Sequence, residues 1–201
     1  MSLLLTNAFE DIKRRYLEVI EQTPGMAEYT RWKYGQHPSD EMLQGYINRG
    51  EMYVYTEEET VKGMVAITMY QGEDYEDVSW GRMLQKDEVA VLHILAVCPA
   101  YQKQEIAEKM VREAIGLAAE HNKKAVRLDS LGFNIPAQKM YEKLGFSYRG
   151  KLQLYAENTG WTDFKFYEWS LEKAWPEGLR YINGYGGCRD ETVAQVEIGY
   201  G

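Results

Sequence analysis

The strongest local pattern in this chain is Asn134-Ile-Pro-Ala137-Gln-Lys-Met-Tyr141-Glu-Lys-Leu-Gly145-Phe146. Asn134 is a good N-cap residue, apolar residues recur after it at helical spacing, and Gly145 suits the position that follows a helix. These features predict a helix over residues 135–144. Asn134 and Tyr141 are seven positions apart, about two turns, so their side chains project along the same side. Taken alone, the period fits a plain cap, a core aromatic residue and a helix-ending glycine.

The sequence before this helix predicts a strand–helix–strand unit. Residues 89–97 form an almost unbroken apolar run, which is typical of a strand buried on both faces. Residues 106–119 carry apolar side chains at helical period, and residues 125–128 read as a short strand. Because a helix connects them, the two strands should run parallel and be joined by a right-handed crossover.

The remaining elements predict one α/β or α+β sheet with helices on both faces. A helix over residues 8–21 ends before Pro24 and Gly25, and Ser39 caps a second helix. Two hairpins are expected, 51–56 with 61–70 and 147–155 with 161–171. We assign residues 1–172 to this domain and 173–201 to a C-terminal extension that packs on the domain or on a second subunit.

Composition excludes several classes of function. The formal net charge of -8 over 201 residues repels phosphates and anionic lipid, which argues against nucleic-acid or membrane binding and mildly favours a cationic substrate. The two cysteines, Cys98 and Cys188, give neither a disulfide framework nor a metal cluster. No run reaches the roughly 18 apolar residues of a membrane span, and the first residues lack the charged start of a signal peptide. A cytoplasmic protein without a metal is the expectation.

The segment from Asn134 to Phe146 resembles the distinctive motif of the GNAT superfamily of N-acyltransferases, Asn-x-x-Ala-x-x-x-Tyr-x-x-x-Gly-Phe, at every position. The resemblance implies a mixed, mostly antiparallel sheet whose central parallel strands are splayed by a bulge. It also implies that Tyr141 protonates the departing CoA thiolate and that Asn134 hydrogen-bonds the pantetheine arm or a nearby backbone group. A phenol carries a proton at neutral pH, which suits a general acid.

Two further segments are similar to the family's acyl-CoA site. In residues 92–102, main-chain groups of Leu95, Ala96 and Val97 are expected to bind the pantetheine amides and the acyl carbonyl, although a plain buried strand is the alternative. The turn that wraps the CoA pyrophosphate corresponds to Gln102-Lys103-Gln104-Glu105-Ile106-Ala107. Gln102 and Ala107 fit the family pattern. Glu105 departs from it, because it puts a side chain and a negative charge where the family has its main glycine, and Lys103 is a compensating cation.

Two residues are candidates for taking the proton of the acceptor amine. His93 precedes Val97 by four residues, so an unbroken strand would put it on the same face as Leu95 and Val97. Asp129 lies at the end of the short strand, before Asn134. A satisfied buried histidine and a loop or capping carboxylate are the structural alternatives. We expect these two residues to act together through water.

The acceptor pocket is expected between the loop over residues 32–38 and the final hairpin, lined by Trp32, Tyr34, His37 and Trp161. The sequence thus predicts an N-acetyltransferase that uses acetyl-CoA, modifies a primary amine by direct attack, and forms a possible homodimer. The alternatives are a non-catalytic, weakly CoA-binding module of the same fold, which Glu105 favours, and an interaction protein that dimerises through residues 173–201.

Overall fold

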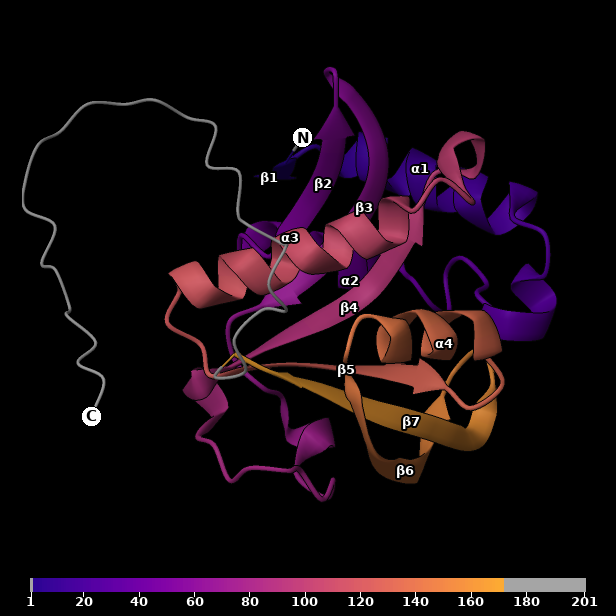
Figure 1. Ribbon diagram of the computed structural model, residues 1–201. Coiled ribbons are helices and arrows are strands. Elements are labelled where there is room, and N and C mark those ends of the chain that lie inside the picture. Colours follow the sequence, from indigo (N-terminus) through magenta and orange to yellow (C-terminus); the bar gives the residue numbers. More distant parts are fainter. Residues whose placement is uncertain (1, 172–201) are drawn as a thin grey trace, which may run out of the picture.

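The computed structural model describes residues 2–171, in which seven strands form one sheet with helices on both faces (Figure 1). The sheet order is β1-β2-β3-β4-β5-β7-β6, and among these strands only β4 and β5 pair in parallel. The strands are β1 (Ser2–Leu5), β2 (Met52–Glu57), β3 (Thr60–Thr68), β4 (Val89–Val97), β5 (Ala125–Leu131), β6 (Ser147–Ala156) and β7 (Gly160–Ser170). The α-helices are α1 (Phe9–Gln22), α2 (Asp40–Asn48), α3 (Ile106–Glu120) and α4 (Ile135–Lys143).

Each face of the sheet is covered by two helices. The apolar sides of α3 and α4 pack on one face, against residues such as Ala90, Leu92 and Val126. Helices α1 and α2 cover the other face, with Ile12, Tyr16 and Leu43 fully buried there. The predicted fold class, a mostly antiparallel sheet with one central parallel pair and helices on both faces, is confirmed.

The local signals of the sequence act as expected at three helix ends. The side chain of Ser39 accepts a hydrogen bond from the Met42 N–H, 3.2 Å away, and Asn134 does the same for Ala137 at 3.3 Å. Gly145 follows α4 with a φ of 90°, which glycine adopts without strain. Caps of this kind fix where the polypeptide enters and leaves each helix, and hence where Asn134 lies in the site.

Two boundaries differ from the prediction. Strand β1 was not predicted, because its short run of leucines lacks the alternation of a half-buried strand; it is held by antiparallel pairing of Ser2–Leu5 with β2. Strand β5 continues to Leu131 instead of ending at Leu128. Its extra residues pair with β7 alone, and Asp129, which pairs with Phe166, therefore lies inside a strand.

The parallel strands β4 and β5 separate after four residue pairs. They are paired from Val89 and Ala125 to Leu92 and Leu128, and no pair follows, while β4 runs on to Val97. Figure 1 shows the two strands together at one end of the sheet and diverging toward the other. The gap between them is the splay that the family resemblance implies.

A bulge in β4 accompanies this separation. Met64 pairs with Ala96 but Ala66 pairs with His93, so β4 contains one residue more than β3 over this stretch. Ile94 has a φ of 45°, unusual for a β-branched residue. The extra residue reverses the alternation of side chains: Leu92 faces α3 before the bulge, and Leu95 and Val97 face it afterwards.

The segment between β3 and β4 is anchored to the sheet by a buried arginine. Arg127 on β5 is 1% exposed; its Nη2 lies 2.8 Å from Oε2 of Glu168 on β7, and its guanidinium carbon lies 4.0 Å from the ring centroid of Trp80. The same guanidinium donates to the Arg82 carbonyl at 3.0 Å and to the Gln71 side chain. These contacts hold residues 71–82 against β5.

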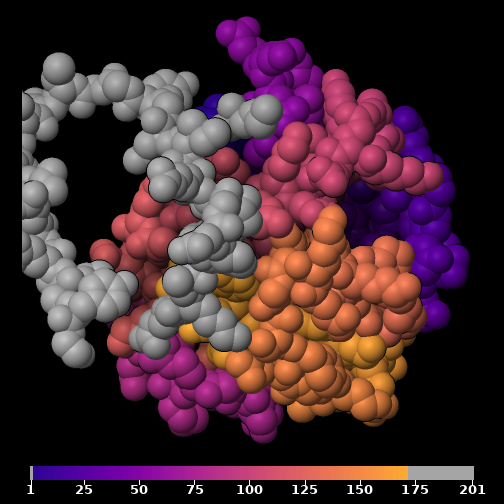
Figure 2. Space-filling view, viewed as in Figure 1, coloured from indigo at the N-terminus to yellow at the C-terminus, as the bar shows by residue number. Residues whose placement is uncertain are grey.

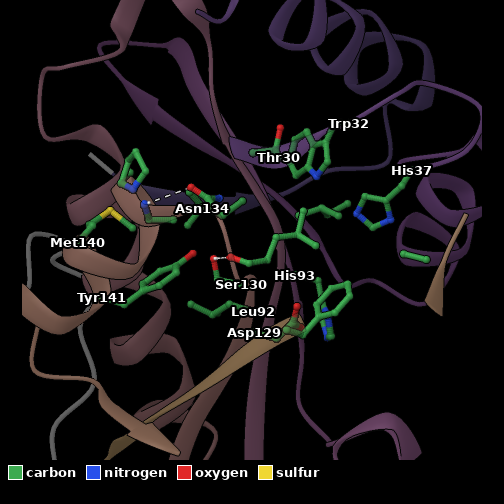
Figure 3. A pocket seen from close by; sticks show the side chains of 18 of the residues that line it. Thr30, Trp32, His37, Leu92, His93, Asp129, Ser130, Asn134, Met140 and Tyr141 are labelled. Carbon is green, nitrogen blue, oxygen red and sulfur yellow. Dashed lines mark hydrogen bonds between the residues drawn. The ribbon is translucent and has the colours of Figure 1, made fainter. Parts of the chain in front are cut away.

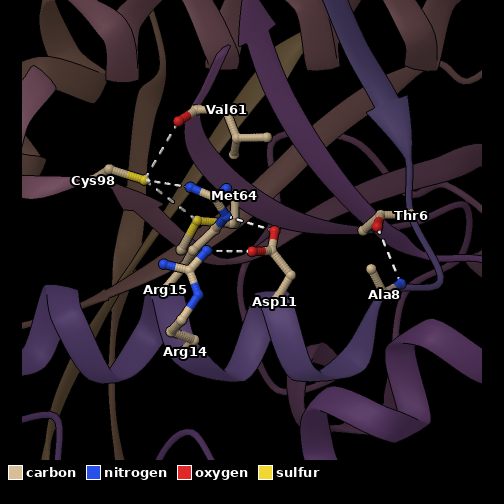
Figure 4. Close-up of polar contacts among 8 residues, drawn as sticks. All are labelled: Thr6, Ala8, Asp11, Arg14, Arg15, Val61, Met64 and Cys98. Atoms are coloured by element: carbon tan, nitrogen blue, oxygen red, sulfur yellow. Dashed lines mark hydrogen bonds and ion pairs between the residues drawn. The ribbon is translucent and has the colours of Figure 1, made fainter. Parts of the chain in front are cut away.

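Helix α1 is tied to the end of β4 through Cys98, as Figure 4 shows. Nη1 of Arg15 lies 3.8 Å from Sγ of Cys98, and the same guanidinium donates through Nε to Asp11 at 2.7 Å. Cys98 is only 4% exposed, and burial raises the pKa of its thiol, so this cysteine is unsuited to nucleophilic catalysis. Cys188 and the predicted extension over residues 173–201 lie outside the described residues.

Candidate active site

A cavity of about 440 Å³ opens where β4 and β5 separate. Figure 2 shows a recess between the loop that follows β4 and the α4 region. In close view, Asn134, Met140 and Tyr141 lie on one side of the cavity and Trp32 and His37 on the other (Figure 3). Because β4 and β5 do not pair with each other here, the cavity connects the face of the sheet covered by α3 and α4 with the face covered by α2.

The first side is built by α4. Tyr141 is 8% exposed, and its ring packs against Phe146 and Tyr167 with centroid distances of 5.8 and 6.0 Å. Its hydroxyl points into the cavity (Figure 3) and has no hydrogen-bond partner within residues 2–171. Burial raises the pKa of this phenol well above its usual range, so it keeps its proton at neutral pH. The structure therefore brings Asn134 and Tyr141 to one cavity wall, as their spacing predicts.

The end of β4, which pairs with β3 but no longer with β5, forms the floor of the cavity. Leu95 and Val97 line the cavity, whereas the Ala96 side chain is 4% exposed and belongs to the core under α1. The Ile94 carbonyl, turned away by the bulge, accepts a hydrogen bond from the Tyr16 hydroxyl at 2.6 Å. Tyr16 thus holds the bulge open by satisfying its backbone, a contact that the sequence alone does not reveal.

The turn between β4 and α3 has the shape of an anion-binding loop. Lys103 and Glu105 both have left-handed backbone, with φ of 60° and 59° on either side of Gln104. Alternation of this kind points successive N–H groups to one side, and α3 begins at Ile106 without a side-chain cap. The left-handed conformation at Glu105 explains why glycine suits this position. Holding a glutamate there costs about 1 kcal/mol.

Two other residues of this segment have structural roles. The Gln102 side chain turns inward and donates to the Thr23 hydroxyl at 2.7 Å and to the Val97 carbonyl at 3.2 Å, which ties the turn to the end of α1. Ile106 is 2% exposed and belongs to the core. Ala107 lines the cavity directly. At the turn before α3 this segment therefore presents its backbone more than its side chains.

His93 lies on the other side of the sheet. The same face as Leu95 and Val97 was expected only for an unbroken strand, and the bulge at Ile94 reverses the alternation. Its ring stacks on Tyr46 at a centroid distance of 5.6 Å, and Nε2 lies 3.3 Å from the Thr68 hydroxyl. Burial lowers the pKa of His93 to about 4, so the imidazole is neutral at pH 7.

Asp129 faces the cavity from β5, on the same side of the sheet as His93. Tyr75 donates a hydrogen bond from its hydroxyl to the Asp129 carboxylate. Burial raises the pKa of Asp129, while the hydrogen bond from Tyr75 opposes that shift. Tyr75 comes from the segment that Arg127 anchors, and no local pattern in the sequence marked it. Asp129 was expected at the end of this strand, and it lies inside it because β5 continues to Leu131.

The far end of the cavity lies between the loop over residues 32–38 and the final hairpin, as predicted. Trp32 and His37 line it, but the predicted Tyr34 and Trp161 do not. Tyr34 is partly buried against the core under α1 and donates to Asp40 at 2.6 Å, and Trp161 is 72% exposed at the hairpin, where it contacts Tyr155. Lining residues that the sequence did not single out for the site include Thr30, Met42, Tyr46, Ser130 and Asn158.

The described residues 2–171 hold no group of three or more His, Cys, Asp or Glu side chains arranged for a metal ion. In the same residues, no helix is both long and apolar enough to cross a membrane.

A mixed sheet with one parallel pair that separates at a bulge, flanked by helices on both faces, defines the GNAT fold. The chain belongs to the acetyltransferase (GNAT) family, whose sequence model matches residues 7–146. No curated protein sequence matches the chain.

Solved structures share the fold at low sequence identity. An acetyltransferase of the GNAT family from Streptococcus agalactiae aligns with a TM-score of 0.64 and 19% identity, over 86% of this chain and 96% of that one. A Salmonella typhimurium protein solved with its cofactor acetyl-CoA gives 0.61 and 16%, over 89% and 98%. A ribosomal-protein-alanine N-acetyltransferase from Brucella melitensis gives 0.61 and 16%, over 85% and 100%.

Proposed function

We propose that this protein is an N-acetyltransferase that transfers the acetyl group of acetyl-CoA directly to a primary amine. The observation that carries the proposal is the cavity that crosses the sheet where β4 and β5 part. It has a protonated phenol, Tyr141, on one side and a carboxylate, Asp129, on the other. A transfer between two bound substrates needs access from both sides of the thioester, and this cavity gives it.

The chain's fit to acetyl-CoA rests on three features. The turn at Lys103–Glu105 directs N–H groups outward for a diphosphate, assisted by the positive end of α3. The edge of β4 from Leu95 to Val97 is unpaired toward β5, which leaves main-chain groups for the pantetheine amides and the acyl oxygen. Asn134 lies where its free amide group can reach the same arm. Acetyl-CoA supplies the acetyl group as an activated thioester.

The proton balance assigns a role to each side of the cavity. A C–N bond forms and a C–S bond breaks, so one proton has to leave the amine and one has to reach the sulfur. Tyr141 donates from its hydroxyl to the sulfur, because it stays protonated at neutral pH and a positioned acid is worth about 10²–10⁴-fold in rate. Asp129 accepts from the ammonium group, directly or through water. Neutral His93 beside it accepts a hydrogen bond and orients that water.

A CoA-release assay tests this proposal. Purified full-length protein with acetyl-CoA should release free thiol in the presence of an amine, and mass spectrometry should detect the N-acetylated product. Amino acids, polyamines, aminoglycosides and peptide N-termini form the first panel. Titration calorimetry with acetyl-CoA and CoA is the independent readout. If neither molecule binds at millimolar concentration, the proposal is wrong.

Glu105 supports one competing function, a GNAT-fold module that binds a ligand without transferring an acyl group. Its carboxylate adds negative charge beside the expected diphosphate site and occupies left-handed backbone that glycine adopts freely. Glu105→Gly removes both obstacles and should raise CoA affinity about 5-fold or more by calorimetry. If affinity rises while no amine supports turnover in either protein, the non-catalytic function is favoured; turnover in the natural protein excludes it.

A further inference from the structure

The acceptor end of the cavity shows which amines it can take. Its walls come from the loop at Trp32 and His37, from Met42 and Tyr46 on α2, and from His93 on β4. Trp32 lies 6.0 Å from His37 and Tyr46 lies 5.6 Å from His93, measured between ring centroids. All four rings are partly buried in the fold and present their remaining surface at this end. These walls offer apolar and π surface, which suits a flat hydrocarbon body and an ammonium group.

Few charged side chains line the acceptor end of the cavity. Among the residues that the structure describes, Asp129 is the one carboxylate that lines the cavity, and no lysine or arginine lines it. The two histidines add no positive charge at pH 7, because burial lowers the pKa of both. Arg49 stands behind Tyr46, 5.3 Å from the ring centroid, and its Nε lies 2.8 Å from the Glu51 carboxylate. Its charge is therefore paired outside the cavity.

The far rim limits the length of an acceptor. Asn158, in the turn of the final hairpin, donates a hydrogen bond to the Arg31 carbonyl at 2.8 Å. Asn158 and Thr30, the chain neighbour of Arg31, both line the cavity, so this contact links the final hairpin to the segment before Trp32 at the edge of the cavity. The volume of about 440 Å³ is shared between the acetyl end of the donor and the acceptor. A small molecule fits this space better than a segment of protein chain.

We propose that the acceptor is a small primary amine with one positive charge, an aromatic body and no anionic group, of the arylalkylamine class. Asp129 binds its ammonium group, and Trp32 with its neighbouring rings binds its body. An added carboxylate would find no cation in the cavity and would face Asp129. A second ammonium group would be buried without a partner, and both situations are strongly unfavourable. This inference rests on the proposed acetyl transfer and deepens it.

Matched pairs of amines test the inference with the full-length protein. 2-Phenylethylamine and phenylalanine differ by one carboxylate, and hexylamine and 1,6-hexanediamine differ by one amine. We expect kcat/KM to be about 100-fold or more higher for the first member of each pair, and 2-phenylethylamine to exceed hexylamine. Equal or better turnover of phenylalanine or the diamine would overturn the inference while leaving acetyl transfer intact. Turnover of another amine of the panel without turnover of 2-phenylethylamine would overturn it as well.

Two variants test whether Trp32, which lines the pocket, binds the amine, whereas an exposed tryptophan outside the pocket does not. Trp32→Ala should raise KM for 2-phenylethylamine about 10-fold or more and leave KM for acetyl-CoA unchanged. Trp161→Ala is the matched control, since it removes an indole that is 72% exposed and outside the cavity, and it should change neither value. Equal effects of the two substitutions on the amine would contradict a binding role for Trp32. A failure of the proposed function looks different, because then no amine in the panel is acetylated, whether or not acetyl-CoA binds.

Discussion

Tyr141→Phe removes one hydroxyl oxygen from the cavity and leaves the packing of the ring unchanged. The ring keeps its contacts with Phe146 and Tyr167, and the lost hydroxyl has no hydrogen-bond partner within the described residues. The free energy of unfolding should therefore change by less than about 1 kcal/mol, which is less than about 4 °C in Tm for a domain of this size. Catalysis should fall far more, because the phenol is the proton donor to the sulfur. A positioned acid contributes about 10²–10⁴-fold, or about 3–5 kcal/mol in activation free energy.

The assay is steady-state thiol release with the best amine substrate, with KM for acetyl-CoA measured beside kcat. Tyr167→Phe is the matched control, because the Tyr167 ring packs against Tyr141 and the same change removes one hydroxyl from it. This hydroxyl lies 3.4 Å from the Glu142 carboxylate. That control should keep its kcat within about 2-fold. If Tyr141→Phe also keeps kcat within about 3-fold while its Tm is unchanged, Tyr141 is not the acid.

Three further predictions concern the surroundings of Asp129 and two ion-pair networks that stabilise the fold. Tyr75→Phe removes a hydrogen bond that lowers the pKa of Asp129, so the acid limb of the kcat/KM profile should move to higher pH, whereas a purely structural role would leave its position unchanged. Arg127→Met leaves Glu168, which is 2% exposed, without its closest cation, and should lower the free energy of unfolding by about 3–5 kcal/mol in urea titrations. Glu57 has its pKa lowered to about 2 by hydrogen bonds from two lysines, so its stabilising effect is complete above about pH 4.5 and lost as pH falls toward 2. Glu57→Gln should therefore lower Tm at pH 7, and the difference from the natural protein should vanish near pH 2.

The helices and the central strand were predictable because their signals are local. The Asn134 cap, the period of apolar residues and the glycine after α4 each act within a few residues, and all three are seen in the structure. The spacing of Asn134 and Tyr141 was sufficient to bring both side chains to one wall of the cavity.

The errors in the site come from events that involve distant residues. The bulge at Ile94 depends on the register with β3 and on the Tyr16 hydroxyl, and it moved His93 to the opposite face from Leu95. Tyr75 reaches Asp129 from a segment that Arg127 holds against the sheet. Contacts between residues tens of positions apart leave no periodic trace in the sequence.

The aromatic residues show the same limit. Trp32 and Trp161 were both expected in the acceptor pocket, yet one lines the cavity and the other is 72% exposed. Their different positions follow from the tertiary structure: the Trp32 ring packs on Tyr16 at a centroid distance of 5.8 Å, whereas Trp161 lies near the tip of a two-stranded hairpin. The sequence indicated an acceptor pocket with aromatic walls, but it did not show which aromatic residues line that pocket.

A crystal structure of the full-length protein with CoA tests the central claim most directly. We expect the CoA sulfur to lie in the gap between β4 and β5 beyond Leu92 and Leu128, within about 3–4 Å of the Tyr141 hydroxyl, with the diphosphate on the turn before α3. CoA bound away from this gap, or β4 and β5 paired along their whole length, would contradict the account.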